Sequence, residues 1–152
     1  MGRVSTGTEC NSHAAMSKLE TPMTRRYWER VGGTLLEEYL VVPPSRGVGR
    51  RVVDAIIIVG GDYRIASRAE NVSLDGHDLI VVQTKASRLG MYLLGQALFS
   101  RPLIEDRFAP RSVRTVALCA ADDAVLRSLA VRFGIEVVVD DLAARSQHQS
   151  DQ

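Results

Sequence analysis

The chain has 152 residues, 45% of them hydrophobic and 24% charged, which is typical of one globular domain large enough to bury a core. A formal net charge of +1 excludes a generally basic protein, so nucleic-acid binding would need a local cluster of arginines. No apolar run approaches the length of a membrane span, and the two cysteines, Cys10 and Cys119, have neither disulfide nor zinc-site spacing. We therefore expect no membrane partner and a location in the reducing cytoplasm.

The two ends of the chain lack sustained hydrophobic periodicity. Residues 1–23 are rich in Ser, Thr and Gly and predict a flexible N-terminal tail. Residues 143–152 end in a polar run that predicts a second flexible tail. The folded domain is therefore expected between residues 24 and 142.

The first predicted element is a helix that begins at Thr24, a residue type that caps helices, and ends near Tyr39. Its apolar positions recur at helical spacing. Gly32-Gly33 weakens this helix but would let it pack closely on a sheet. The helix would carry Glu37 and Glu38 in its C-terminal half, before two prolines end regular structure.

Strands are predicted next, from the apolar runs Val52–Val59 and Leu79–Lys85. Asp54 interrupts the first of these runs. Between the runs, Gly60-Gly61-Asp62 predicts a tight turn and Tyr63–Ser67 an edge strand.

The second half of the chain alternates helix and strand patterns. We predict, in order, a helix Leu89–Arg101 closed or kinked by Pro102, a strand Val113–Cys119, a helix from Asp122 to Phe133, and a strand Ile135–Val139. The short return between the last two strands implies a parallel pair. The whole pattern predicts an α/β fold, with a mixed sheet and helices on both of its faces.

Four polar features remain after the apolar pattern is explained: Asp54 within one strand, Gln83 and Lys85 on another, and Glu37 or Glu38 beside them. Lys85 is notable because Lys18 is the only other lysine among 19 basic residues. A lysine supplies a compact charge with a tunable pKa, whereas arginine is charged permanently.

These side chains fit the chemistry of phosphodiester hydrolysis. Such a reaction uses a divalent cation to neutralise charge and to lower the pKa of the attacking water. Magnesium needs only one or two carboxylates and keeps several waters, so Asp54 with the amide oxygen of Gln83 would suffice. Lys85 would then orient the water or offset charge on the phosphate.

Together these residues resemble the PD-(D/E)xK phosphodiesterase superfamily, which includes restriction endonucleases, Holliday-junction resolvases, and repair and defence nucleases. The core of that family is a helix with a glutamate, a strand with the aspartate, a strand with (Glu/Asp)-x-Lys, then a helix and a further strand. Asp54 matches the aspartate, Gln83-Thr84-Lys85 the tripeptide, and Glu38 or Glu37 the helix acid. Val53 stands in the place of the family's proline, and Gln-x-Lys is the variant of the Mrr-like restriction branch.

The resemblance covers about residues 24–139. It implies a restriction-endonuclease-like core and Mg²⁺- or Mn²⁺-dependent cleavage of DNA, in restriction, repair or mobile-element defence. It also implies Asp54 and Gln83 as metal ligands, Lys85 as the water-activating or charge-stabilising residue, and Glu38 or Glu37 as an auxiliary acid. A domain of this size would cut both strands of a duplex most simply as a homodimer.

Basic side chains near the expected site would contact DNA phosphates. The candidates are Arg46, Arg50, Arg51 and Arg88. The alternative is that they are scattered surface arginines in an arginine-rich chain.

Other interpretations stay open for the site. Asp54 could instead pair with Arg50 or Arg51 at a strand end, and Gln83 and Lys85 could lie at a solvated strand terminus. The corresponding functions are a degenerate nuclease fold that binds DNA or a protein partner without cleavage, or a structural α/β domain whose exposed strand binds a protein partner.

Overall fold

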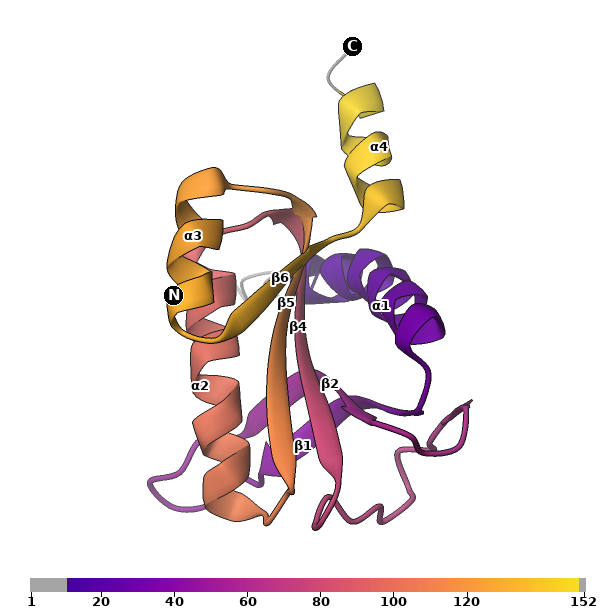
Figure 1. Cartoon of the computed structure of the whole chain (residues 1–152), viewed down its shortest axis with the longest axis vertical. Helices are drawn as coiled ribbons and strands as arrows, with labels where there is room; N and C mark the ends of the chain where they lie inside the picture. The colour runs from indigo at the N-terminus through magenta and orange to yellow at the C-terminus, as the bar shows by residue number, and fades with distance from the viewer. Residues whose placement is uncertain (1–10, 151–152) are drawn as a thin grey trace, which may run out of the picture.

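The computed structural model describes residues 11–150, which form an α/β protein with a six-strand mixed sheet and four helices (Figure 1). The elements follow in the order α1 Asn11–Val31, β1 Thr34–Val42, β2 Arg51–Ile58, β3 Arg64–Ile65, β4 Asp78–Arg88, α2 Met91–Arg107, β5 Ser112–Ala121, α3 Ala124–Arg132, β6 Ile135–Val139 and α4 Asp141–Ser150. None of the helices in this described part of the chain is long and apolar enough to span a membrane.

The strands lie in the order β3-β1-β2-β4-β5-β6. The first half of the sheet is largely antiparallel, because β2 runs opposite to both β1 and β4. The second half is parallel, from β4 through β5 to β6. The parallel pairing of β5 and β6 confirms what the short return through α3 predicted. β3 lies at the edge and pairs with β1 in parallel.

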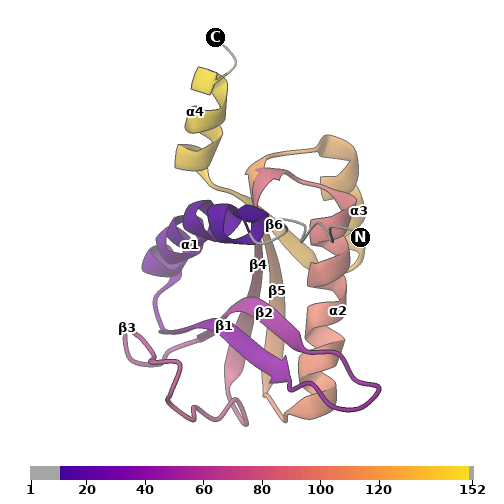
Figure 2. The same ribbon diagram turned by 180° about the vertical axis from the view of Figure 1, so that it is seen from behind.

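The helices cover both faces of the sheet, as predicted (Figures 1 and 2). On one face, α1 contributes Met23, Tyr27 and Trp28 to a core with apolar side chains of the central strands. On the other face, α2 and α3 pack on β5 and β6 through residues such as Leu93 and Ala130. Both faces are buried, which explains why the central strands read as continuous apolar runs.

The predicted helix from Thr24 to Tyr39 is wrong at both ends. The helix begins at Asn11 and ends at Val31, and a strand follows from Thr34. Gly32 and Gly33 form the boundary, both with positive φ angles of 75° and 83°. Glycine adopts this conformation without steric cost, so the pair ends the helix. A Cβ at Gly33 would lie 2.3 Å from the carbonyl oxygen of Ile58, so β1 can approach β2 only with glycine here.

This boundary moves two site candidates. Glu37 and Glu38 lie on β1 and not on a helix. The part of the expected N-terminal tail within the described residues is helical from Asn11, and its Met23 is buried. Residues 1–10 of that tail lie outside the described residues. In the expected C-terminal tail, α4 runs to Ser150 and projects past the end of the sheet (Figure 1).

The other elements agree with the sequence patterns to within a few residues. β6 has the predicted bounds Ile135–Val139, and Gly134 before it has a φ of 68°. α2 continues through Pro102 to Arg107, further than predicted. The predicted edge strand Tyr63–Ser67 is reduced to Arg64–Ile65.

Candidate functional site

Strands β2 and β4 separate near the middle of the sheet. Their antiparallel ladder ends at the pair Ala55–Val82. Beyond it, side chains replace the backbone ladder: Asp54 Oδ2 accepts a hydrogen bond from Thr84 N at 2.8 Å, and Asp54 N donates to Gln83 Oε1 at 3.4 Å. Both backbone N–H groups therefore find partners where the strands diverge.

A cavity lies at this separation. It collects acidic and basic side chains from α1, β1, β2, β4 and the loop after β3. Its lining consists of Glu20, Thr21, Thr24, Arg25, Glu37, Glu38, Asp54, Arg68, Thr84 and Lys85. Asp54, Lys85 and Glu38 are thus brought together, and Gln83 is absent from the lining.

Asp54 is a partly buried acid of this cavity. Burial raises the pKa of its carboxyl above the ordinary value, and the charge of Glu38 acts in the same direction. The hydrogen bond from Thr84 N and the charge of Lys85 oppose this shift in part. A partly buried carboxylate whose described partners are one N–H group and one nearby cation is stabilised by a further positive charge.

Gln83 is 3% exposed and sits in a chain of hydrogen bonds on the α2 side of the sheet. Its Oε1 accepts from Asp54 N, and its Nε2 donates to Ser100 Oγ at 2.8 Å. Ser100 Oγ in turn donates to Gln96 O at 2.6 Å, so the hydroxyl can only accept from residue 83. An amide has both an acceptor and a donor, whereas a carboxylate only accepts. This network accounts for the glutamine.

Lys85 lies where the two helical layers approach β4. Its Nζ is 3.8 Å from Glu20 Oε1 on α1 and 5.5 Å from the centre of the Tyr92 ring on α2. The side chain of Thr84 lies on the α1 face of the sheet, opposite to that of Gln83, and its hydroxyl is 2.8 Å from that of Thr24. Lys85 lines the same cavity as Thr84.

Glu37 and Glu38 lie on β1 at the level of Asp54. Arg25 donates two hydrogen bonds to Glu37, at 2.7 and 3.0 Å. Arg68 lies 2.6 Å from Glu38 Oε2. Glu38 is the one non-glycine residue with positive φ, 47°, among the described residues. Strained backbone of this kind is typical of functional sites.

Glu20 is the acid that the sequence interpretation missed. It precedes Thr24 by one helical turn on α1, within the segment expected to be a tail, and Thr24 Oγ1 donates to its carbonyl at 3.1 Å. The signal for it was the spacing of Glu20, Thr24 and Trp28, which are four residues apart and share a helix face. Pro22 obscured that signal, because proline usually ends a helix.

The predicted DNA-contacting arginines separate into two groups. Arg46, Arg50 and Arg51 are exposed on the hairpin between β1 and β2, where a Ser45–Val48 bridge forms the tip. Asp54 lies three residues beyond Arg51 on β2, and none of these three arginines lines the cavity.

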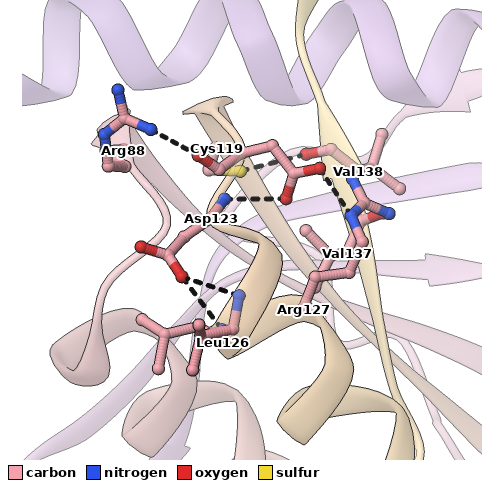
Figure 3. Close-up of polar contacts among 9 residues, drawn as sticks. Arg88, Cys119, Asp123, Leu126, Arg127, Val137 and Val138 are labelled. Carbon is pink, nitrogen blue, oxygen red and sulfur yellow. Dashed lines mark hydrogen bonds and ion pairs between the residues drawn. The ribbon is translucent and has the colours of Figure 1, made fainter.

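Arg88 has a structural contact. It donates to the carbonyl of Asp122 at 2.6 Å and so ties the end of β4 to the start of α3 (Figure 3). Beside it, the carboxylate of Asp123 caps α3 by accepting from Val125 N and Leu126 N. Arg127 also reaches this corner, with a bond to Asp122 Oδ2 at 2.7 Å.

The cavity matches a hard divalent cation in donor chemistry. Oxygen ligands from one or two carboxylates plus water suit magnesium, and Asp54 and Glu20 are candidates for that role. Among the described residues, no three His, Cys, Asp or Glu side chains are grouped as a preformed metal site. Two of the four acids that line the cavity, Glu37 and Glu38, form ion pairs with Arg25 and Arg68 instead of facing a common point.

Searches of protein-family models, of curated proteins and of solved structures gave no match to this chain. The resemblance to PD-(D/E)xK nucleases accordingly rests on the residues and the arrangement described above.

Proposed function

We propose that this chain is a divalent-cation-dependent nuclease domain of the PD-(D/E)xK type, with a restriction-endonuclease-like core, which hydrolyses phosphodiester bonds in DNA. The observation that carries the proposal is the meeting of Asp54, Lys85 and Glu20 at one cavity. They come from β2, β4 and α1.

The order of elements supports the same proposal. An acid-bearing helix α1 is followed by β1, by β2 with Asp54, by β4 with Gln83-Thr84-Lys85, and then by α2 and β5. This order agrees with the family core, once Glu20 takes the place of the helix acid that was expected at Glu37 or Glu38.

Each residue has a distinct role in the proposal. Asp54 and Glu20 would hold the magnesium or manganese ion, which would supply positive charge at the phosphate and lower the pKa of a bound water. Lys85 would place its ammonium group beside the charge that develops on the phosphate. Gln83, with both amide atoms engaged, would position the backbone of Asp54 instead of binding the ion.

The test is cleavage of plasmid and linear duplex DNA by the purified chain with Mg²⁺ or Mn²⁺. We expect Lys85→Ala and Asp54→Asn to reduce the rate by at least ~100-fold, in keeping with the loss of a charge-stabilising group. Lys18→Ala is the matched control, because it removes the other lysine from an exposed position on α1, two residues before Glu20. Equal cleavage by Lys85→Ala and by Lys18→Ala would refute the site.

A second candidate function is DNA binding without cleavage. It is favoured by the arginines that hold Glu37 and Glu38, and by the lack of a preformed three-residue metal site in the described part of the chain. The exposed arginines of the β1–β2 hairpin would then supply the phosphate contacts.

The salt dependence of duplex binding, measured together with cleavage, distinguishes binding alone from nuclease activity. Replacing Arg46, Arg50 and Arg51 together by Gln should weaken duplex binding for all sequences, and should lower the slope of log affinity against log salt by about 2–3. If the wild-type chain binds duplex with a steep slope but does not cleave it with either cation, the binding function is favoured.

A further inference from the structure

Two of the acids at the cavity are held by arginines that also line it. Arg25 donates two hydrogen bonds to the carboxylate of Glu37, and Arg68 forms an ion pair with Glu38. The arginine side chains remain 48% and 71% exposed. The Arg68–Glu38 pair is exposed on both sides, and such pairs contribute about 0–1 kcal/mol of net stability, so exchange of partners is energetically accessible there. The Arg25–Glu37 pair is bidentate and its glutamate is 16% exposed, so its exchange needs a partner that accepts both donors, as a phosphate does.

The formal charge of the cavity is close to balance. Its ionisable lining comprises the four acids Glu20, Glu37, Glu38 and Asp54 and the three bases Arg25, Arg68 and Lys85, which leaves one negative charge. A divalent cation alone would turn this into one positive charge. A cation together with one phosphodiester would make the sum zero, so the two ligands complement each other electrostatically.

Guanidinium groups favour phosphate as a partner. Their planar fork matches two oxygens of a phosphate as well as two oxygens of a carboxylate. Arg25 already presents two donors, Nε and Nη2, in this geometry toward Glu37. A phosphodiester in the cavity would therefore compete directly with Glu37 and Glu38 for the same donors.

We propose that Arg25 and Arg68 are phosphodiester-binding residues that Glu37 and Glu38 hold in the free protein, so that DNA and a divalent cation reinforce each other's binding at this cavity. Binding of phosphate releases the two glutamates and makes the cavity more negative for a cation. A bound cation attracts the two glutamates away from Arg25 and Arg68, and the two arginines can then bind phosphate. This inference rests on the proposed function, because it assumes that DNA phosphates enter this cavity.

The coupling is measurable without cleavage. Mn²⁺ is titrated into the Lys85→Ala chain, with free Mn²⁺ followed by its paramagnetic resonance signal, with and without a saturating short duplex. We expect the duplex to tighten Mn²⁺ binding by about 5- to 150-fold, the range usual for coupled sites. By reciprocity, Mn²⁺ must tighten duplex binding by the same factor, which fluorescence anisotropy measures.

The arginines are then removed in the same background. With Arg25→Gln and Arg68→Gln combined, the free protein should bind Mn²⁺ several-fold more tightly, and the enhancement by duplex should fall close to one. Arg101→Gln is the control, because it removes the same charge from an Arg101–Glu105 pair on α2 that does not line the cavity. It should leave both affinities and the coupling unchanged.

The outcomes separate this inference from the proposed function. Duplex recovered from each titration, and from wild-type reactions, is analysed on a denaturing gel. Cleavage by wild type without Mn²⁺–duplex coupling overturns the inference and leaves the nuclease assignment intact. Coupling that disappears in the double arginine variant supports the inference, even if wild type fails to cleave. Coupling that persists unchanged in that variant overturns it.

Discussion

The carboxylate of Asp54 accepts a hydrogen bond from the backbone N–H of Thr84, at 2.8 Å, just beyond the last backbone pair of β2 and β4. One side chain therefore joins two strands and also supplies a partly buried charge to the cavity. These two roles have opposite effects on stability. The hydrogen bond satisfies a buried backbone donor, whereas the burial of the charge costs free energy.

Replacement of Asp54 should separate the two roles. Asp54→Asn keeps an oxygen acceptor for Thr84 N and removes the charge. Because the folded-state pKa of Asp54 is raised, its contribution to stability falls as pH rises above the unfolded carboxyl pKa of about 4. Asp54→Asn should therefore raise Tm over wild type at neutral pH, and this gain should shrink below that pKa. Thermal unfolding across pH measures both.

The control for that prediction is Asp54→Ala, which leaves Thr84 N without its acceptor. We expect it to cost about 1–3 kcal/mol relative to Asp54→Asn, from urea unfolding. Equal stability of the two variants would show that the hydrogen bond is unimportant.

Gln83→Glu tests the hydrogen-bond chain through Ser100. At neutral pH the variant would bury a carboxylate beside a hydroxyl that can only accept from it, so we expect a loss of several kcal/mol in the free energy of unfolding. A protonated glutamic acid again has one donor and one acceptor, like glutamine. The loss should therefore be recovered as pH falls, in urea unfolding curves recorded without divalent cations.

The alternative is that Gln83 is a metal ligand, and the same variant distinguishes the two roles. If it is a ligand, Gln83→Glu should tighten Mn²⁺ binding at little cost in stability, because a carboxylate is the stronger ligand.

The strained backbone at Glu38 leads to a further prediction. A non-glycine residue in the left-handed region is disfavoured by about 1–2 kcal/mol, so Glu38→Gly should be more stable than Glu38→Ala by about 1 kcal/mol. Both variants lose the pair with Arg68. At the neighbouring Glu37, which lacks this strain, Gly should be less stable than Ala. The same order at both positions in urea unfolding would contradict the prediction.

Asp140 anchors α4 to α1. It is 4% exposed, accepts two hydrogen bonds from Arg26, and caps α4 through Ala143 N. Burial alone would raise the pKa of Asp140, but the bonds from Arg26 and Ala143 N lower it below its ordinary value. Asp140→Asn retains a cap and should cost about 1.5–3 kcal/mol through loss of the charged pair. Asp140→Ala should cost about 1 kcal/mol more, because the cap is also lost.

The pH dependence of this pair has a fixed sign. Because the pKa of Asp140 is lower in the folded than in the unfolded protein, its ionised form stabilises the fold at pH values above the unfolded pKa of about 4. This stabilisation is lost as pH falls through the folded-state pKa. The difference between wild type and Asp140→Asn should therefore narrow in acid. A difference independent of pH would exclude the charge as its source.

Cys119 should be chemically inert in the folded protein. Burial, with the charge of Asp122, raises the pKa of its thiol to about 11, and its Sγ lies 3.6 Å from the carbonyl oxygen of Val138. With Cys10 replaced by Ser, a thiol reagent should label the folded chain slowly at mildly alkaline pH, and at once after unfolding in urea. Fast labelling of the folded chain would show that β5 and β6 open locally.

Most of the fold could be predicted from the spacing of apolar residues in the helices and from the continuous apolar runs of the strands. β6 was predicted residue for residue because Gly134 and Asp140 bracket it. The first helix was misplaced because the apolar spacing of Leu35, Leu36 and Tyr39 also fits a helix face. The pair Gly32-Gly33 was the stronger signal, because two adjacent glycines favour a helix end over a helix interior.

Some of the residues that line the candidate cavity could be selected from the sequence. Asp54 and Lys85 could be selected because each is an exception to a local pattern, an acid within an apolar strand and a lysine among arginines. Glu20 could not be selected without knowing that α1 extends past Pro22. The engagement of Gln83 with Ser100 is a contact between distant segments, which no local pattern encodes.

The separation of β2 and β4 also bears on how this site would change during evolution. Gln83 engages both atoms of its amide, so under the proposed nuclease function a descendant that lost catalysis would still be selected to keep Gln83 for folding, whereas an asparagine at position 54 would also serve Thr84 N. Among the described residues, Lys85 has an ion pair at 3.8 Å and a contact with an exposed aromatic ring, so little would preserve it if a proposed cleavage activity were lost. If the proposed nuclease function is correct, retention of the lysine in related sequences is therefore the better marker of activity.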